Sequence, residues 1–247
     1  YRSSPMPKPT TKVPPSRSLD AIFRPRSVAV IGASRKRQTI GREILANLVE
    51  CGFSGPVYPV NPTAEAIHSI RCFRTIKDIP GPVDLAIVTV AKDQVLPVVA
   101  ACGKKGVRGL IVITAGFKEI GSEGALLEGK LKAMLQAYRM RMIGPNCMGV
   151  VNTEPDVSLN ATFAATAPVR GNVGFVSQSG ALGEAILADA VDNGLGVAMF
   201  VSMGNKTDVS GNDLLEYWED NPDIQAILMY LESFGNPRRF TTIARRV

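Results

Sequence analysis

The chain has 247 residues, of which 45% are hydrophobic and 20% are charged. This composition is typical of a globular protein with one or two domains and excludes a disordered chain. No stretch approaches the roughly 20 apolar residues of a membrane span, and no apolar core of a signal peptide follows the N-terminus. We therefore expect a cytoplasmic protein that makes no contact with membranes.

The charge pattern and the cysteines limit the kinds of ligand and partner that we expect for this chain. The net charge is +6 at pH 7, but the basic residues do not form a stripe interleaved with aromatic side chains, so we expect no nucleic acid binding. The excess charge indicates attraction of small anions or simply a solvated surface. The four cysteines lack C-x-x-C spacing and the chain has one histidine, which argues against a metal site or a disulfide framework.

In chain order, a proline-rich stretch precedes a regular alternation of strands and helices. Residues 1–18 contain five prolines and few large apolar side chains, which predicts a linker or tail. Residues 19–151 alternate between short β-branched runs and helical periods, which predicts right-handed βαβ crossovers and a Rossmann-type parallel sheet. The expected strands are 27–33, 56–62, 84–90, 110–114 and 140–146, and the expected helices are 41–52, 93–105 and 123–138.

The remaining residues predict a second α/β unit. Residues 152–170 lack clear periodicity and are expected to be an interdomain connection. Residues 171–247 then contain three further strands, which is fewer than the roughly five of a flavodoxin-like domain, so we expect a partial flavodoxin-like domain. Its expected strands are 172–178, 197–204 and 225–232, and its expected helices are 180–192, 212–220 and 237–247.

The turn after the first expected strand predicts a phosphate-bearing ligand. It begins with Gly32, continues through Ser34 and the three bases 35–37, and leads to Gly41 at a helix start. A glycine-rich turn at a helix N-terminus offers free N–H groups and partial positive charge to an anion. The alternative is a purely structural turn with solvated bases. An NAD site is not favoured, because G-x-G-x-x-G is absent and the second strand ends in Val60-Asn61-Pro62 without an acidic residue.

A second anion site is expected where residues 177–180 end a strand and open a helix. Ser177, Gln178, Ser179 and Gly180 offer backbone amides and hydroxyls to a phosphate. The alternative is that Ser179 only caps the helix.

Four segments together resemble one family. They are Ser27–Ser34 (SVAVIGAS), Tyr58–Pro62 (YPVNP), Met142–Cys147 (MIGPNC) with Gly149 after it, and Gly174–Leu182 (GFVSQSGAL). Over residues 19–247 the chain resembles the α-subunit of succinyl-CoA synthetase and the wider NDP-forming acyl-CoA synthetases. The resemblance implies a CoA-binding portion of an enzyme that makes acyl-CoA, NDP and phosphate from an acid, CoA and an NTP through a phosphohistidine.

The resemblance also implies roles for single residues. It places the phosphate near residues 177–180, and it gives Glu232 a catalytic contact with the phosphohistidine. Cys147 is placed near the CoA thiol without a covalent role, and no base is paired with it. The residues implied to bind CoA or acyl-CoA are Gly32, Ala33, Ser34, Val60, Asn61, Pro62, Val90, Ala91, Thr114, Ala115, Gly116, Phe117, Asn146 and Cys147.

The phosphohistidine of the family lies in an S-H-T-G or G-H-A-G loop farther along than residue 247, while His68 is expected to be a surface or capping residue. We therefore expect this stretch of chain to bind CoA without turnover, with ATP or ADP and Mg binding only to an ATP-grasp domain or subunit. An alternative function is acyl-CoA sensing beside a fused GNAT-type lysine acetyltransferase. A redox sensor for NAD(H) or CoA is a further alternative, and self-association as a homo-oligomer remains open.

Overall fold

A computed structural model of the chain describes residues 19–246. The predicted linker, 1–18, lies outside the described residues. No helix within 19–246 combines the length and the apolar character that crossing a membrane requires.

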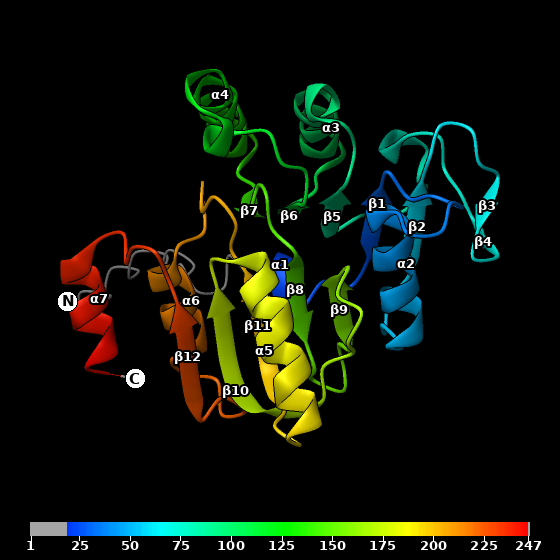
Figure 1. The fold of residues 1–247 in the computed structure, drawn as a ribbon. Coiled ribbons are helices and arrows are strands. Elements are labelled where there is room, and N and C mark those ends of the chain that lie inside the picture. The colour runs from blue at the N-terminus through cyan, green and yellow to red at the C-terminus, as the bar shows by residue number, and fades with distance from the viewer. Residues whose placement is uncertain (1–18, 247) are drawn as a thin grey trace, which may run out of the picture.

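The first sheet is parallel and has the strand order β2-β1-β5-β6-β7 (Figure 1). Its three central strands, β1, β5 and β6, are buried along their whole length because helices cover both faces, and this explains their continuous apolar sequences. The chain runs from β1 to β2 on one side and returns to β5 on the other, which puts a topological switch point beside β1. The predicted Rossmann-type sheet is confirmed. The strands are β1 (Val28–Ile31), β2 (Val57–Val60), β5 (Leu85–Val88), β6 (Gly109–Val112) and β7 (Arg141–Ile143).

Two pairs of helices cover the faces of this sheet. Helices α3 (Lys92–Lys105) and α4 (Ser122–Tyr138) lie on one face, and α1 (Asp20–Phe23) and α2 (Ile40–Glu50) lie on the other (Figure 1). Side chains of β1 alternate between the two layers, with Val28 and Val30 in the core below α2 and α1, and Ala29 and Ile31 in the core beside α3 and α4. Smaller elements are the hairpin β3 (Ala66–Ile67) and β4 (Ile70–Arg71) and the 3-10 turns η2 (Ile76–Asp78) and η3 (Lys118–Ile120).

The second sheet begins earlier in the chain than expected. Its order is β12-β10-β11-β8-β9, in which β8 (Gly149–Asn152) pairs antiparallel with β11 and β9 (Leu159–Thr162) pairs antiparallel with β8. Residues 152–170 are therefore not only a connection, because they contain β9. Every residue of β8 and β9 is buried. Strand β8 (GVVN) has no polar and apolar alternation because it is covered on both faces, and β9 (LNAT) is only four residues long, so its alternation is too short to indicate a strand.

The rest of the second unit follows the expected alternation. Its parallel strands are β10 (Arg170–Ser177), β11 (Val197–Ser202) and β12 (Ala226–Tyr230). Helix α5 (Gly180–Asp192) lies in front of the sheet in Figure 1, with α6 (Gly211–Trp218) behind it and α7 (Pro237–Ala244) at one side.

The two units share one core. The rings of Phe23 in α1 and Tyr217 in α6 stack with centroids 5.1 Å apart, and the Tyr217 hydroxyl donates to Asp20 at 2.9 Å. Helix α2 packs on β9, and one cluster of buried side chains includes residues of both sheets. This shared core fixes the two sheets relative to each other.

The turn into β8 provides a test of the unexpected strand pairing. Gly149 has φ of +119°, and a Cβ at this position would overlap the carbonyl oxygen of Ala161 in β9. We expect Gly149→Ala to lower the free energy of unfolding by about 1 to 3 kcal/mol, measured by urea denaturation. The matched control is Gly129→Ala in α4, where a Cβ meets nothing within 4 Å and alanine favours the helix. Equal stability of the wild type and Gly149→Ala would contradict the pairing of β8 with β9.

Candidate functional site

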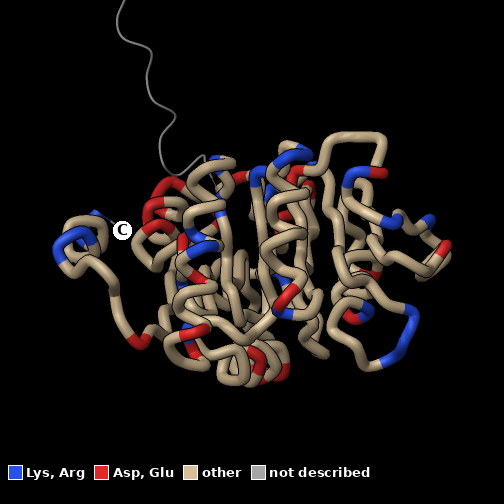
Figure 2. The backbone as a smooth tube through the Cα atoms, turned by 90° about the horizontal axis from the view of Figure 1, so that it is seen from above, with Lys and Arg blue, Asp and Glu red and all other residues tan. Residues whose placement is uncertain are grey.

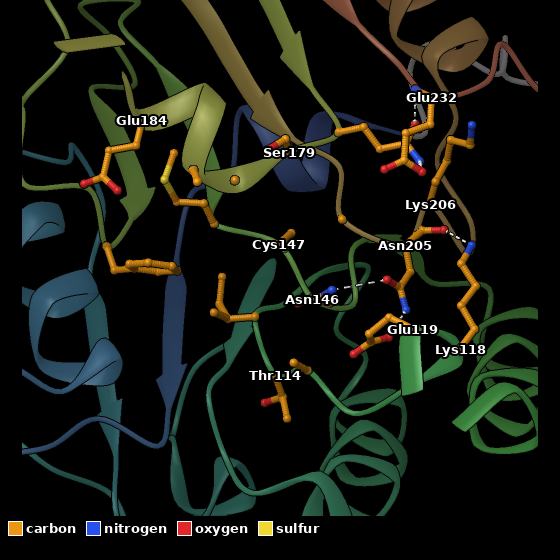
Figure 3. Close-up of a pocket in the computed structure, with 18 of the residues that line it drawn as sticks. Thr114, Lys118, Glu119, Asn146, Cys147, Ser179, Glu184, Asn205, Lys206 and Glu232 are labelled. Atoms are coloured by element: carbon orange, nitrogen blue, oxygen red, sulfur yellow. Dashed lines mark hydrogen bonds between the residues drawn. The ribbon is translucent and has the colours of Figure 1, made fainter. Parts of the chain in front are cut away.

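A cleft of about 1020 Å³ opens where the two sheets meet. The residues that follow β6, β7, β10, β11 and β12 all line it (Figure 3). The carboxyl ends of parallel strands are where open α/β sheets bind ligands, because loops diverge there and helix N-termini point inward. The cleft is therefore the candidate site.

The cleft combines the two groups of residues that the sequence indicated. One group belongs to the first sheet and was implied to bind the thiol end of CoA, and the other belongs to the second sheet and was expected to bind phosphate. By sequence alone these two groups are expected to form separate sites. In the structure the two sheets pack together so that residues of both groups line one cavity. The predicted residues that line it are Thr114, Ala115, Asn146, Cys147, Gln178, Ser179, Gly180 and Glu232.

The other residues implied to bind CoA lie along the same edge of the first sheet, outside the cleft lining. Because the strand order is β2-β1-β5-β6-β7, their positions follow one another toward the cleft. They are Val60 at the end of β2 with Asn61 and Pro62 after it, Gly32, Ala33 and Ser34 after β1, Val90 and Ala91 after β5, and Gly116 and Phe117 after β6.

Asn61 connects the first two of these turns. Its Nδ2 donates to the carbonyl oxygen of Ala33 at 2.8 Å, while its Oδ1 accepts from the amides of Thr63 at 2.9 Å and Ala64 at 3.0 Å. The side chain thus holds the β1–α2 turn against the turn after β2. Asn61 therefore has a structural role at this edge of the sheet, independent of any ligand.

Several predicted residues present no side chain to a ligand. Phe117 is fully buried in the core beside α3 and α4, and Ala33 and Val60 are also buried. Ser177 is fully buried too, and its hydroxyl donates to the carbonyl oxygen of Ser179 at 2.6 Å, so it is not directed at an anion as expected. At these four positions only the backbone is available to a ligand.

The start of α5 forms one wall of the cleft. The Ser179 Oγ accepts from the amide of Leu182 at 3.3 Å, which is the capping role that the sequence also allowed. Beside it, Gln178 Nε2 donates to Glu232 Oε2 at 3.2 Å, and the Glu232 amide donates to Gln178 Oε1 at 3.0 Å. This reciprocal pair fixes the Glu232 carboxylate at the ends of β10 and β12, close to the helix N-terminus.

Two lysines that sequence reasoning did not indicate also line the cleft, Lys118 and Lys206. Lys206 Nζ donates to the carbonyl oxygen of Ser233 at 2.7 Å and to its Oγ at 2.9 Å. Burial lowers the pKa of Lys206, and the nearby charge of Lys118 lowers it further, against the opposing effect of Glu232. Lys118 is paired with Glu128, whose Oε1 lies 3.8 Å from Lys118 Nζ, so Lys206 is the cation on this side of the cleft that is available to an anion.

Asn205 attaches this part of the second unit to the first. Its Nδ2 donates to Glu119 Oε2 at 2.6 Å and to Glu128 Oε2 at 2.9 Å, and its Oδ1 accepts from Asn146 Nδ2 at 3.4 Å (Figure 3). Lys118 Nζ donates to the Asn205 carbonyl oxygen. Asn205 is buried, and it therefore fixes the position of Lys206, the next residue in the chain. Residues 204–206 follow a strand end, so the rule that indicated the other turns also applies to them.

Cys147 and His68 do not have the surroundings of catalytic groups. Burial raises the pKa of Cys147 to about 12, and its thiol donates to the carbonyl oxygen of Val112 at 3.3 Å, which disfavours a nucleophilic thiolate. His68 lies in the exposed turn between β3 and β4, apart from the residues that line the cleft.

Comparison with known proteins agrees with this arrangement. Residues 26–153 match the family described as CoA binding domain, and residues 170–247 match the succinyl-CoA ligase like flavodoxin domain. The chain is 44% identical over 229 residues to the acetate--CoA ligase [ADP-forming] II subunit alpha of Pyrococcus furiosus, which covers 93% of this chain and 49% of the relative. The chain belongs to the NDP-forming acyl-CoA synthetase family. The resemblance of the four sequence segments is thereby confirmed.

Other synthetase relatives extend the comparison. The acetate--CoA ligase [ADP-forming] of Methanocaldococcus jannaschii is 42% identical, over 93% of this chain and 32% of the relative. The dinucleotide forming acetyl-coenzyme A synthetase 1 of Ca. Korarchaeum cryptofilum, in complex with phosphate and ADP, has a TM-score of 0.88 and 42% identity, over 92% of this chain and 49% of that chain. The chain thus spans about half or a third of the length of these synthetases.

The contact between Asn205 and Glu119 makes a prediction about pH. Burial acts to raise the pKa of Glu119, but hydrogen bonds from Asn205 and from the amides of Gly116 and Phe117 outweigh it and hold the pKa below its ordinary value. Glu119 therefore stabilises the fold above the ordinary glutamate pKa, and this contribution is lost as the pH falls through the lowered value. We expect Asn205→Ala to raise the pKa of Glu119 in a carbon-13 NMR titration.

The control for this titration is Asn193→Ala, which changes an exposed asparagine at the end of α5. It should leave the pKa of Glu119 unchanged. The loss of stability caused by Asn205→Ala should also be larger at neutral pH than at acid pH. An unaltered Glu119 titration in Asn205→Ala would contradict the hydrogen bond between the two side chains.

Proposed function

We propose that this chain is the CoA-binding portion of an NDP-forming acyl-CoA synthetase, which converts a carboxylic acid, CoA and an NTP to acyl-CoA, NDP and phosphate. The observation that supports it best is the single cleft in which strand ends of a CoA-binding-type sheet meet the N-terminus of α5 and its cationic neighbours. An acyl-CoA synthetase needs a thiol and a phosphoryl group next to the same carboxyl carbon.

The edge of the first sheet fits the chemical groups of CoA. Arg35, Lys36 and Arg37 are exposed in the β1–α2 turn, and Figure 2 shows a run of basic residues in this loop. The Lys36 amide is bonded to Ser34 Oγ at 3.0 Å, so the start of the turn is ordered by its own side chain. Cationic groups and backbone amides beside a helix N-terminus suit the phosphates of CoA. The pantetheine arm would then follow the edge past Val90 toward the cleft.

Within the cleft, the residues around α5 suit the phosphoryl group. In the proposed reaction a phosphohistidine gives its phosphoryl group to the acid, and attack of the CoA thiol on the acyl phosphate forms the thioester and releases phosphate. In this proposal the backbone at Gly180 and the cation of Lys206 bind the phosphoryl oxygens, and Glu232 accepts a hydrogen bond from the histidine. The residues near Asn146 would face the thiol.

The proposal assigns the remaining chemistry to other parts of the enzyme. His68 is exposed at a turn apart from the cleft lining, so the phosphohistidine would come from elsewhere, and ATP or ADP with Mg would bind an ATP-grasp domain or subunit. The relatives named above bear the names of ligases and a synthetase, and no observation favours an acetyltransferase or a redox sensor.

Calorimetric titration with CoA, acetyl-CoA, NADH and ADP tests the ligand assignment. We expect CoA and acetyl-CoA to bind and NADH and ADP not to bind. Lys36→Glu should weaken CoA binding about tenfold, because it reverses a charge beside the phosphates. The control Lys130→Glu makes the same charge change on the exposed face of α4 and should alter the affinity much less. Tight NADH binding without any response to CoA would refute the proposal.

The phosphoryl assignment has a separate test with inorganic phosphate. Lys206→Met keeps the length of the side chain and removes its charge, so it should weaken phosphate binding about tenfold, measured by calorimetry at low ionic strength. Lys130→Met is the matched control and should bind phosphate as the wild type does. Phosphate affinity that is the same in wild type and Lys206→Met would remove Lys206 from the site.

A further inference from the structure

One side of the cleft carries two lysines and a carboxylate, and the opposite side is mainly apolar apart from Glu184. Figure 3 shows Lys118, Lys206 and Glu232 together on one side and Glu184 on the opposite side. The amide of Ala165 donates to Glu184 Oε1 at 3.4 Å, which places the segment after β9 on the side of Glu184. The apolar residues that line the cleft include Ile113, Met148, Phe163 and Ala181.

Phe163 is held at this wall by its neighbours in the chain. Asn47 in α2 donates from Nδ2 to the carbonyl oxygens of Thr162 at 2.8 Å and Ala164 at 3.0 Å, the residues on either side of Phe163. The Ala164 amide also donates to Thr162 Oγ1 at 3.3 Å. The backbone is therefore fixed immediately before and after the ring.

The ring itself is half-buried between two groups of core residues. It packs against the core shared by the two sheets and against the smaller cluster that contains Met148 and Phe200. A large side chain that is anchored from below and still lines a cavity has little freedom to move away from a ligand. Phe163 is thus a rigid limit on the apolar side.

We propose that Phe163 sets the size of the acyl group that the cleft accepts. This inference rests on the proposed function, in which the thioester forms near Asn146 and Cys147. The reacting carboxyl carbon must face the thiol and the phosphoryl group, and the charged side of the cleft takes the phosphoryl oxygens. The hydrocarbon part of the acid is then directed to the remaining apolar side, where Phe163 and Met148 lie. The substrate class is a short monocarboxylate whose hydrocarbon chain carries no further charge and ends against the Phe163 ring.

The size of the effect follows from burial of methylene groups. Each methylene that is buried against an apolar surface increases the affinity about fourfold. A methylene for which the cleft has no room does not contribute this increase. Shortening the side chain at position 163 opens space for about two further methylenes, which predicts a change of about sixteenfold for a longer acyl chain.

The test is calorimetric titration of the chain with acetyl-, butyryl- and hexanoyl-CoA. The readout is the affinity for hexanoyl-CoA divided by that for acetyl-CoA, in which the contribution of the CoA part cancels. We expect Phe163→Ala to raise this ratio about sixteenfold, Phe163→Leu to raise it less, and Phe163→Trp to lower it. Leu126→Ala, which changes an exposed residue of α4, is the control and should leave the ratio as in the wild type.

A second variant tests whether the hydrogen bonds of Asn47 hold the Phe163 ring in position, as distinct from a general loss of stability. Asn47→Ala keeps the phenyl ring but removes both hydrogen bonds that flank Phe163, so the ring can move away from a longer acyl chain and the same ratio should rise in the direction of Phe163→Ala. Loss of fold stability alone would lower the affinity for all three thioesters equally and would not move the ratio.

The outcomes distinguish the two proposals. If the wild type binds neither CoA nor any thioester, the proposed function fails. If the wild type binds them but Phe163→Ala, Phe163→Leu and Phe163→Trp all have the affinity ratio of the wild type, the function stands and the role of Phe163 is refuted.

Discussion

The buried amide of Asn205 is the contact on which the geometry of the cleft depends. It donates to two carboxylates, Glu119 and Glu128, and both belong to the first unit. A buried carboxylate such as that of Glu128 is costly without donors, and the Asn205 amide supplies one donor to it and one to the exposed Glu119. The loop after β11 therefore has one favourable position relative to α4. That position brings Lys206 beside Glu232 and defines the charged side of the cleft.

The second requirement is the core shared by the two sheets. Helix α2 covers β1 with one part of its surface and meets β9 with another, and Phe23 of α1 stacks on Tyr217 of α6. Because side chains in such a core are close-packed, the two sheets do not slide freely past each other. The strand ends of both sheets consequently remain at one cleft. An arrangement in which each unit had its own separate core would not fix these ends in this way.

The sequence predicted most of the elements and only part of the site. Continuous β-branched runs and helices of ordinary length identified the parallel strands of both sheets, since local pattern and tertiary environment agree there. Strands β8 and β9 were not predicted, because each has only four residues and every one of these residues is buried. The strand-end rule indicated Gln178, and the family resemblance implied Asn146 and Glu232. Contacts such as that between Asn205 and Glu128 are 77 positions apart in the chain, and no local pattern reports them.

The close approach of β1 and α2 has a consequence for binding at the edge of the first sheet. A Cβ on Gly41 would overlap the carbonyl oxygen of Gly32, so the strand end and the helix start touch backbone to backbone. This contact holds the two ends of the basic turn close together. The Asn61 side chain also holds the turn through its hydrogen bond to the carbonyl oxygen of Ala33. An anion that binds there meets a loop that is already shaped, and little conformational entropy is lost on association.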